Sequence, residues 1–116
     1  MTETKDIYWL AGLLEGEGSF IADGRFPKIA LKMNDRDVVQ RAQELLRPKP
    51  YRANGNAIKY YEDKTAIPIR KYWFASISGR RAVGWMLTLY PLMGERRKAR
   101  IRELITAWKI GTAPAH

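Results

Sequence analysis

The sequence predicts a single α+β domain in which helices pack against one antiparallel sheet. Three observations support this. The segment 6–17 is apolar at almost every helical position, two later segments alternate in the way β-hairpins do, and the chain closes on two helical segments. A chain of 116 residues is long enough for one hydrophobic core. We therefore expect one domain over 1–110 and a tail over 111–116.

The first helix is predicted over 6–17, with Thr4 or Asp6 as its N-cap and Gly18 as its end. A hairpin over 19–33 follows, because an Asp-Gly pair at 23–24 provides the turn and apolar residues alternate with polar ones from 29 to 33. Asn34 is positioned to cap a second helix over 35–46.

The second half of the chain is predicted to contain a second β-hairpin followed by helices. Two prolines at 48 and 50 end the second helix, and a β-rich segment over 51–77 has a turn near 63–66. Pro68 indicates an irregular or edge start to the last strand. Two helices are predicted over 79–89 and 95–110. The expected order is therefore αββαββα, followed by a further helix.

The charge of the chain points to a polyanionic partner. Lys and Arg number 21 against 12 Asp and Glu, which gives a net charge of +9. Nucleic acid is favoured over an anionic membrane, although small basic proteins are also basic for solubility alone. Only one base but five acids fall within residues 1–24. Residues 1–24 are therefore acidic, and the rest of the chain is strongly basic.

The composition excludes several kinds of chemistry. The chain has no Cys, and its one His is His116, so disulfides, thiolate nucleophiles, Cys-based zinc modules and histidine catalysis are not expected. Any metal site must use oxygen ligands. Neither a membrane-spanning stretch nor a signal peptide is evident, so we expect a soluble protein, cytoplasmic or nucleoid-associated, with no membrane partner and no small-molecule substrate.

The segment 6–17 has two unusual features. It is apolar nearly all round, as a central core helix would be, or as a helix shared between its own core and a two-fold partner. Gly12 and Gly16 lie four apart on one face, which permits close approach of a second helix. Glu15 and Glu17 stand in the last turn, against the helix dipole. They indicate either a ligand cation or a solvated helix end.

The string that contains these glycines and acids is Leu10-Ala11-Gly12-Leu13-Leu14-Glu15-Gly16-Glu17-Gly18-Ser19-Phe20. It resembles the signature of the LAGLIDADG homing endonucleases, with Glu for Asp at both acidic positions. The resemblance covers most of the chain, because the family core is αββαββα. The segment 89–98 is similar to the family's proline turn and basic helix start. The implied fold is a saddle-shaped antiparallel sheet with the signature helix at a two-fold dimer interface.

Members with one signature act as homodimers, and the resemblance implies an interface built by Leu10, Gly12, Leu13 and Gly16. Each protomer would bind half of a pseudo-palindromic double-stranded DNA target. Glu17 matches the family's metal-binding carboxylate, with the backbone carbonyl of Gly16 beside it. The implied metal is Mg²⁺ or Mn²⁺, which would activate water for phosphodiester hydrolysis.

Three further positions match the family's catalytic surroundings less closely. Asp35 falls near the place of a polar residue that positions water or metal, although an Asp at a helix start is commonly a simple cap. Arg96 or Lys98 matches a basic residue beside the active site, able to stabilise the charge of the transition state. Both also fit a solvated basic helix face.

The family contacts DNA with the concave face of its sheet. Period-2 alternation directs Phe20, Ala22, Ile29, Leu31 and Met33 toward the helices. Alternation does not decide which face of the last strand points toward DNA. One face contains residues 70, 72 and 74, and the other contains residues 71, 73 and 75. The candidate DNA-contacting residues are Ser19, Ile21, Asp23, Arg25, Lys28, Lys32, Lys59, Tyr61, Arg70, Lys71 and Trp73.

The leading hypothesis is therefore a homodimeric, metal-dependent, site-specific homing DNA endonuclease encoded by a mobile element, such as an intron, an intein or a phage gene. The main alternative is a protein of the same fold that does not cut, either a DNA-binding regulator or an RNA maturase. These two hypotheses differ in one observable property, which is cleavage of a bound DNA target.

Overall fold

A computed structural model describes residues 3–47 and 58–111 of the chain. The elements, in order, are α1 (Thr4–Glu17), β1 (Gly18–Asp23), β2 (Phe26–Met33), α2 (Arg36–Leu46), β3 (Lys59–Asp63), β4 (Arg70–Ser78), α3 (Arg80–Leu89), the 3₁₀ helix η1 (Tyr90–Leu92) and α4 (Glu95–Ile110). The α+β class and the expected order of helices and strands are confirmed. None of the described helices is long and apolar enough to cross a membrane.

Two helix starts differ from the prediction. The first helix begins at Thr4 with Glu3 as its N-cap, so neither Thr4 nor Asp6 is the cap. The second begins at Arg36 with Asp35 as its N-cap. Asp35 takes this place because its backbone is extended and its carbonyl accepts the first helical hydrogen bond, from the Val39 N–H at 3.1 Å. The expected end of this helix at prolines 48 and 50, and the start of the β-rich segment, lie outside the described residues.

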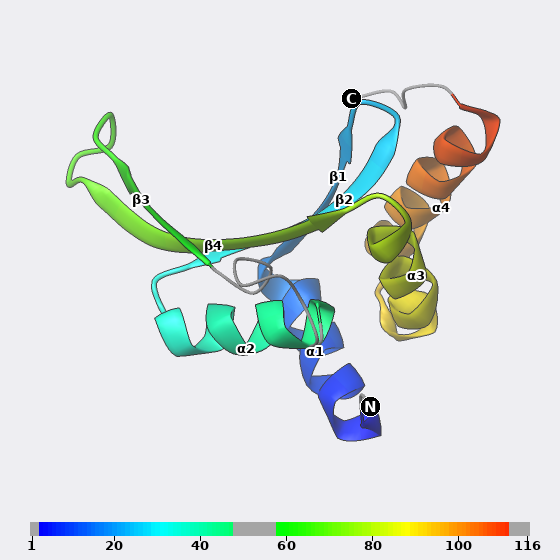
Figure 1. The fold of residues 1–116 in the computed structure, drawn as a ribbon, viewed down its shortest axis with the longest axis horizontal. Coiled ribbons are helices and arrows are strands. Elements are labelled where there is room, and N and C mark those ends of the chain that lie inside the picture. Colours follow the sequence, from blue (N-terminus) through cyan, green and yellow to red (C-terminus); the bar gives the residue numbers. More distant parts are fainter. Residues whose placement is uncertain (1–2, 48–57, 112–116) are drawn as a thin grey trace.

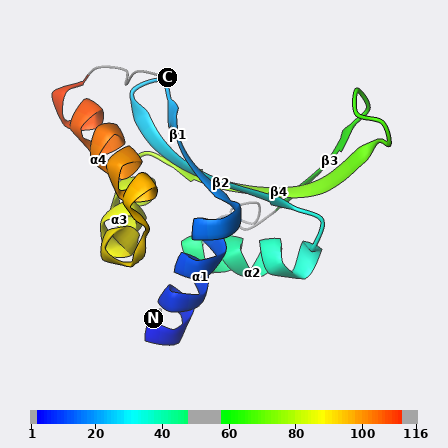
Figure 2. The same cartoon turned by 180° about the vertical axis from the view of Figure 1, so that it is seen from behind.

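The four strands form one antiparallel sheet in the order β1-β2-β4-β3. The sheet is strongly curved, and all four α-helices lie on its convex side, with α1 and α2 below it and α3 and α4 beside it (Figure 1). The view from behind shows α1 and β1 together at the front of the molecule (Figure 2). None of the helices within residues 3–47 and 58–111 lies on the concave side of the sheet.

The hydrophobic core fills the space between the convex face of the sheet and the helices. It includes Leu10 and Leu14 from α1, Ile29 from β2, Ile77 from β4 and Leu104 from α4. Of the five positions of β1 and β2 predicted to face the helices, Phe20, Ile29 and Leu31 are buried, and Ala22 and Met33 are partly buried. Ala30 is also buried although its side chain faces the concave side. Its short side chain lies between Ser19 and Ser76 on the paired strands, which cover it.

Gly18 makes the turn from α1 directly into β1 possible. Its N–H donates to the Leu14 carbonyl and closes the helix, while its own backbone is already extended. A Cβ at this position would lie 2.9 Å from both the Cα and the carbonyl oxygen of Leu14. Backbone atoms of a helix cannot move aside easily, so only glycine fits here. By contrast, a Cβ at Gly12 would meet nothing within 4 Å.

We predict that Gly18→Ala lowers the free energy of unfolding by about 1–3 kcal/mol, the usual cost of overpacking. Gly84→Ala is the matched control, because a Cβ at this glycine of α3 would meet nothing within 4 Å and alanine in the middle of a helix is favoured over glycine by about 1 kcal/mol. Urea denaturation followed by far-UV circular dichroism measures both changes. Equal stability of the two variants would contradict the steric explanation for Gly18.

Candidate nucleic-acid interface and carboxylate site

Glu17 is the last residue of α1, and its side chain is exposed at the point where the helix meets β1. Within the described ranges 3–47 and 58–111, its carboxylate makes no hydrogen bond and no ion pair. A free carboxylate at the C-terminus of a helix is unfavourable, because the partial negative charge of the helix dipole lies there. Glu17 is thus held in place by its backbone alone and remains available to an external cation.

Glu15, the other acid of this turn, is occupied by the protein itself. Its carboxylate accepts a hydrogen bond from the Gly94 N–H at 2.5 Å. It also forms an ion pair with Arg97, whose Nε lies 3.6 Å from Oε2. The sequence left open whether the two acids of this turn bind a cation or are simply solvated. Glu15 does bind a cation, but that cation is the guanidinium group of Arg97.

Arg97 also binds the backbone at the end of α1. Its Nη2 donates to the Glu15 carbonyl at 3.0 Å, and its Nη1 donates to the Gly18 carbonyl at 2.6 Å. These two carbonyls stand on either side of Glu17 in the sequence. A positive charge at a helix C-terminus and a negative charge at a helix N-terminus are both stabilising. Arg97 therefore complements the end of α1, while Glu15 complements the start of α4.

Asp35, Arg96 and Lys98 are the three residues that the sequence predicts near Glu17. Among the described residues, none of them makes contacts like those of Glu15 and Arg97 at the end of α1. Arg96 is exposed, and Lys98 forms an ion pair with Glu95 at 3.7 Å within α4. Asp35 lies at the start of α2, beneath the β3–β4 side of the sheet and away from the end of α1 in both views (Figures 1 and 2). The structure thus brings Arg97 to the end of α1, and it does not bring Asp35 there.

Sequence reasoning missed Arg97, although a signal for it exists. Arg97 precedes the buried residues Ile101, Leu104 and Ile105 by one or two helical turns, so helical spacing places it on the face of α4 that packs against the rest of the molecule. Its side chain is only 12% exposed. Arg96 and Lys98 fall on either side of that face. Charged side chains are seldom buried without a partner, so the arginine on the packed face of a basic helix is the one expected to form an ion pair or hydrogen bonds within the protein.

The donors present fit a hard divalent cation only in part. Within the described residues, no group of three or more acidic or histidine side chains comes together. Among the described residues, the end of α1 offers one carboxylate without a protein partner, Glu17, beside the last-turn carbonyl of Gly16. Mg²⁺ is commonly held by one or two carboxylates with phosphate oxygens and water. Glu17 therefore fits such an ion where nucleic-acid phosphates supply the remaining oxygens.

The concave face of the sheet carries most of the predicted DNA-contacting residues. Strand register places on it Ser19, Ile21, Asp23, Lys28, Lys32, Lys59, Tyr61 and Arg70. Because directly paired residues of antiparallel strands point to the same side, Tyr72 and Phe74 of β4 belong to this face as well. Arg25 lies in the β1–β2 turn, with its guanidinium 5.1 Å from the ring of Phe26.

Two predicted residues, Lys71 and Trp73, lie on the face of the sheet opposite to the other candidates. Trp73 pairs with Met33 and packs against the hydrophobic core, while Lys71 pairs with Glu62. Register decides between the two faces of β4 that alternation left open, because a shift of one residue exchanges all side chains between faces. The concave face therefore contains 70, 72 and 74 of this strand.

The concave face carries a cluster of aromatic rings and lysines from β2, β3 and β4, which we call the ring–lysine patch: Lys28, Lys32, Tyr61, Tyr72 and Phe74. The rings of Tyr61 and Tyr72 stack with centroids 5.5 Å apart, and Phe74 meets Tyr61 edge-on at 5.8 Å. The ammonium groups of Lys28 and Lys32 lie 5.9 and 5.2 Å from the rings of Phe74 and Tyr72. Such contacts hold both lysines over apolar surface with their charge outward.

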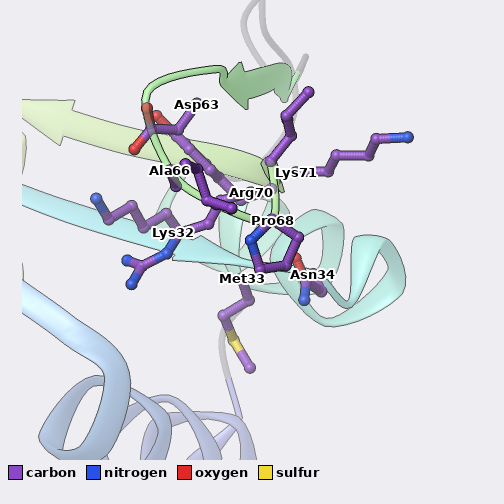
Figure 3. A pocket seen from close by; sticks show the side chains of 11 residues that line it. Lys32, Met33, Asn34, Asp63, Ala66, Pro68, Arg70 and Lys71 are labelled. Carbon is purple, nitrogen blue, oxygen red and sulfur yellow. The ribbon is translucent and has the colours of Figure 1, made fainter.

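The β3–β4 turn closes the outer end of this face around an open hollow of about 860 Å³ (Figure 3). Lys32, Arg70 and Lys71 line it together with Asp63. Hydrogen bonds from the hydroxyl and the backbone N–H of Thr65 lower the pKa of the Asp63 carboxyl. Asp63 therefore stays ionised and orders the turn, while three cations around it leave the hollow positively charged.

The residues expected at the dimer interface separate into two groups. Gly12 and Gly16 are exposed and form an open stripe on α1, and Leu13 beside them is half-buried. Leu10 is 0% exposed within its own protomer. It is wrong as an interface residue, because a side chain buried in the protomer core has no surface left for a partner. Its place on the exposed stripe is taken by Tyr8, one turn before Gly12.

We predict that Arg97→Met lowers the free energy of unfolding by about 2–3 kcal/mol, because charged hydrogen bonds to two backbone carbonyls are lost and Glu15 is left without its cation. The neighbouring exposed Arg96→Met is the matched control, with an expected change below about 0.5 kcal/mol. Thermal and urea denaturation measure both. A similar loss in the two variants would show that Arg97 does not anchor α1.

Comparisons of this chain with protein-family models, with curated proteins and with solved structures found no match. Three features of the molecule bear on its function: a free carboxylate at the end of α1, an open glycine stripe along the same helix, and a basic concave sheet face with aromatic residues.

Proposed function

We propose that this protein is a homodimeric, metal-dependent, site-specific DNA endonuclease that resembles the LAGLIDADG homing endonucleases. The observation that carries the proposal is the free, exposed Glu17 carboxylate at the end of a helix whose open face is lined by glycine. A two-fold copy packed against Gly12 and Gly16 would bring two such carboxylates together. One protomer alone supplies only one.

The concave sheet face supports duplex DNA as the partner. It is free of helices, and it carries four cations, Lys28, Lys32, Lys59 and Arg70, against the two acids Asp23 and Asp63. DNA affinity depends mainly on neutralised phosphates, so this excess of positive charge favours a polyanion. Two faces related by a two-fold axis would fit a pseudo-palindromic target, with one half-site on each protomer.

The residues around Glu17 have separate roles in this proposal. Glu17 and the Gly16 carbonyl would hold Mg²⁺ or Mn²⁺, which supplies Lewis-acid activation of water and stabilises the leaving oxygen. Arg97 fixes the two carbonyls that flank Glu17 and so positions this turn. Lys98 and the exposed Arg96 add positive charge near the start of α4. Asp35, which lies at the start of α2, takes no part in this site.

A second candidate is a DNA-binding regulator or RNA maturase of the same fold that does not cut. Two observations favour it. The basic concave face does not include Glu17, so it could bind nucleic acid without that residue. In addition, no group of three acids that could hold a metal ion is found among the described residues. Binding and cleavage must therefore be tested separately.

We expect Glu17→Gln to abolish cleavage of target DNA in Mg²⁺ while leaving DNA affinity within about twofold, because the amide keeps the shape but loses the charge that holds the metal. Glu44→Gln is the matched control, since Glu44 is an exposed residue of α2 bonded only to Gln40 among the described residues. The assay incubates each protein with a plasmid library of random inserts, with and without Mg²⁺ or Mn²⁺, and sequences the breaks.

Two outcomes of this assay would contradict the proposal in different ways. A wild type that binds DNA and never cuts it in either metal would support the second candidate. Normal cleavage by Glu17→Gln would preserve the endonuclease activity and remove Glu17 from its site.

We expect Gly12→Leu to convert the dimer to a monomer, because a leucine on the open stripe separates two closely packed helices without meeting its own protomer. Sedimentation velocity measures the association state, and Gly84→Leu, at an exposed glycine of α3, is the control. A wild type that is monomeric both free and bound to DNA would refute the two-fold assembly.

A further inference from the structure

The β3–β4 turn presents apolar side chains to solvent. Ile67 is 99% exposed and Ile69 is 51% exposed, with the exposed Pro68 between them. Single exposed apolar residues are ordinary on protein surfaces. Here three of them are consecutive at the tip of a hairpin, and none of the three belongs to the core formed by the described residues. The turn therefore carries apolar surface that only an external partner would bury.

Exposed cations surround this apolar tip. Lys64 precedes it in the turn, and Arg70 and Lys71 follow it at the start of β4. The tip also lines the open hollow of about 860 Å³, whose lining includes Lys32 from β2 (Figure 3). An apolar point with a positively charged rim is complementary to a polyanion that also has an apolar interior.

Hydrogen bonds around Asp63 hold the base of the turn in one shape. The Asp63 carboxylate accepts from the Thr65 N–H at 3.0 Å and from the Thr65 hydroxyl at 2.6 Å. The Asp63 carbonyl accepts from the Ala66 N–H at 3.4 Å. These bonds order the residues that immediately precede Ile67. Presenting the tip to a partner therefore costs little conformational entropy.

The curvature of the sheet directs the tip toward whatever the concave face binds. In Figure 1 the β3–β4 turn rises above the middle of the concave face, on the side away from α1 and α2. A duplex bound to that face meets the tip beyond the last paired residues of β3 and β4, which are Asp63 and Arg70. The tip therefore makes its contact at one end of the sheet, separately from the strands.

An apolar point with a cationic rim matches one known mode of DNA binding. Proteins that bend DNA insert side chains such as Ile, Leu or Pro between neighbouring base pairs, which partly unstacks them and kinks the duplex by about 20–90°. A wedge opens a base step on the side from which it enters, so the duplex bends away from it. This is the sense in which the concave face curves, so the bend brings more phosphates to its cations.

We propose that Ile67, supported by Pro68 and Ile69, is a wedge that inserts between adjacent base pairs and kinks duplex DNA at the outer end of each half-site. This inference rests on the duplex DNA partner of the proposed function. It adds a separate activity, DNA bending, that requires neither Glu17 nor a metal ion. In the proposed homodimer the two wedges lie at equal distances from the two-fold axis, so two kinks are expected.

A lipid surface also accepts an apolar tip with a cationic rim. The shape of the molecule favours DNA, because the rim is continuous with a basic face that is concave. A flat bilayer that received the tip would leave this face uncovered. Binding to lipid is therefore included in the test as an opposing result.

The test measures bending and unstacking of duplexes that the wild-type protein selects from a random-sequence library, in EDTA so that the DNA stays intact. Energy transfer between dyes at the two duplex ends reports the bend. Adenines of the selected site are replaced one at a time by 2-aminopurine, whose fluorescence rises when its neighbours unstack. For the wild type we expect a bend of at least about 20°. We also expect two zones of raised fluorescence at equal distances from the centre.

Variants at the tip separate the wedge from its cationic rim. Ile67→Ser should still bind the duplex but lose most of the bend and both zones of raised fluorescence. Ile67→Leu should keep them, because leucine is also an apolar wedge. Leu87→Ser is the matched control, since Leu87 is 59% exposed on α3, and it should behave as the wild type. Circular dichroism checks that each variant is folded.

Three results would overturn the inference. The first is a straight duplex in the wild-type complex, and the second is an equal bend with wild type and Ile67→Ser. The third is Ile67-dependent flotation with vesicles of phosphatidylcholine and phosphatidylglycerol in place of DNA bending.

Failure of the proposed function is distinguishable from failure of the wedge. A protein that bends DNA in this way but never cuts it in Mg²⁺ or Mn²⁺ retains the wedge and loses only the cleavage activity. A protein that cuts DNA and leaves it unbent retains the endonuclease and loses only the wedge. A wild type that binds no duplex overturns both, because duplex DNA is their shared partner.

Discussion

The end of α1 depends on a guanidinium from a residue 80 positions later in the chain, Arg97. It donates to the carbonyls of Glu15 and Gly18, and Glu15 in turn accepts from the Gly94 N–H at the start of α4. Each helix end receives the charge that its dipole favours. Because β1 follows α1 without a linker, this one junction also fixes where the sheet begins and where Glu17 is presented.

Curvature and register of the sheet separate two kinds of surface. The convex face is apolar and covered by helices, and the concave face is polar, basic and free of them. Side chains alternate strictly between the two, so each strand contributes to both the core and the open face. Met33 and Trp73 pair on the convex side, while Lys32 and Phe74 pair on the concave one. Stability and binding are therefore specified by alternate residues of the same strands.

The proposed activity combines three features that one protomer holds in separate places. The free carboxylate of Glu17 ends α1, the stripe of Gly12 and Gly16 leaves that helix open to a partner, and the ring–lysine patch lies on the concave face of the sheet. In the proposed homodimer, each protomer would contribute one such carboxylate and one basic face, which is half of a symmetric site. Of the 21 bases in the chain, 20 follow residue 24, and four of these, Lys28, Lys32, Lys59 and Arg70, lie on the concave face.

The sequence by itself determined the α+β class, the order of helices and strands, the end of α1 at Gly18 and which face of the first hairpin turns toward the helices. These follow from local periodicity and from turn residues such as Asp23 and Gly24, which act over a few neighbours. Only the tertiary structure decided that Glu15 pairs with Arg97, that Leu10 belongs to the core, and that Trp73 faces the helices. The physical reason is the same in each case: a contact between distant segments or a strand register is set by packing of the whole chain, and local patterns leave it open.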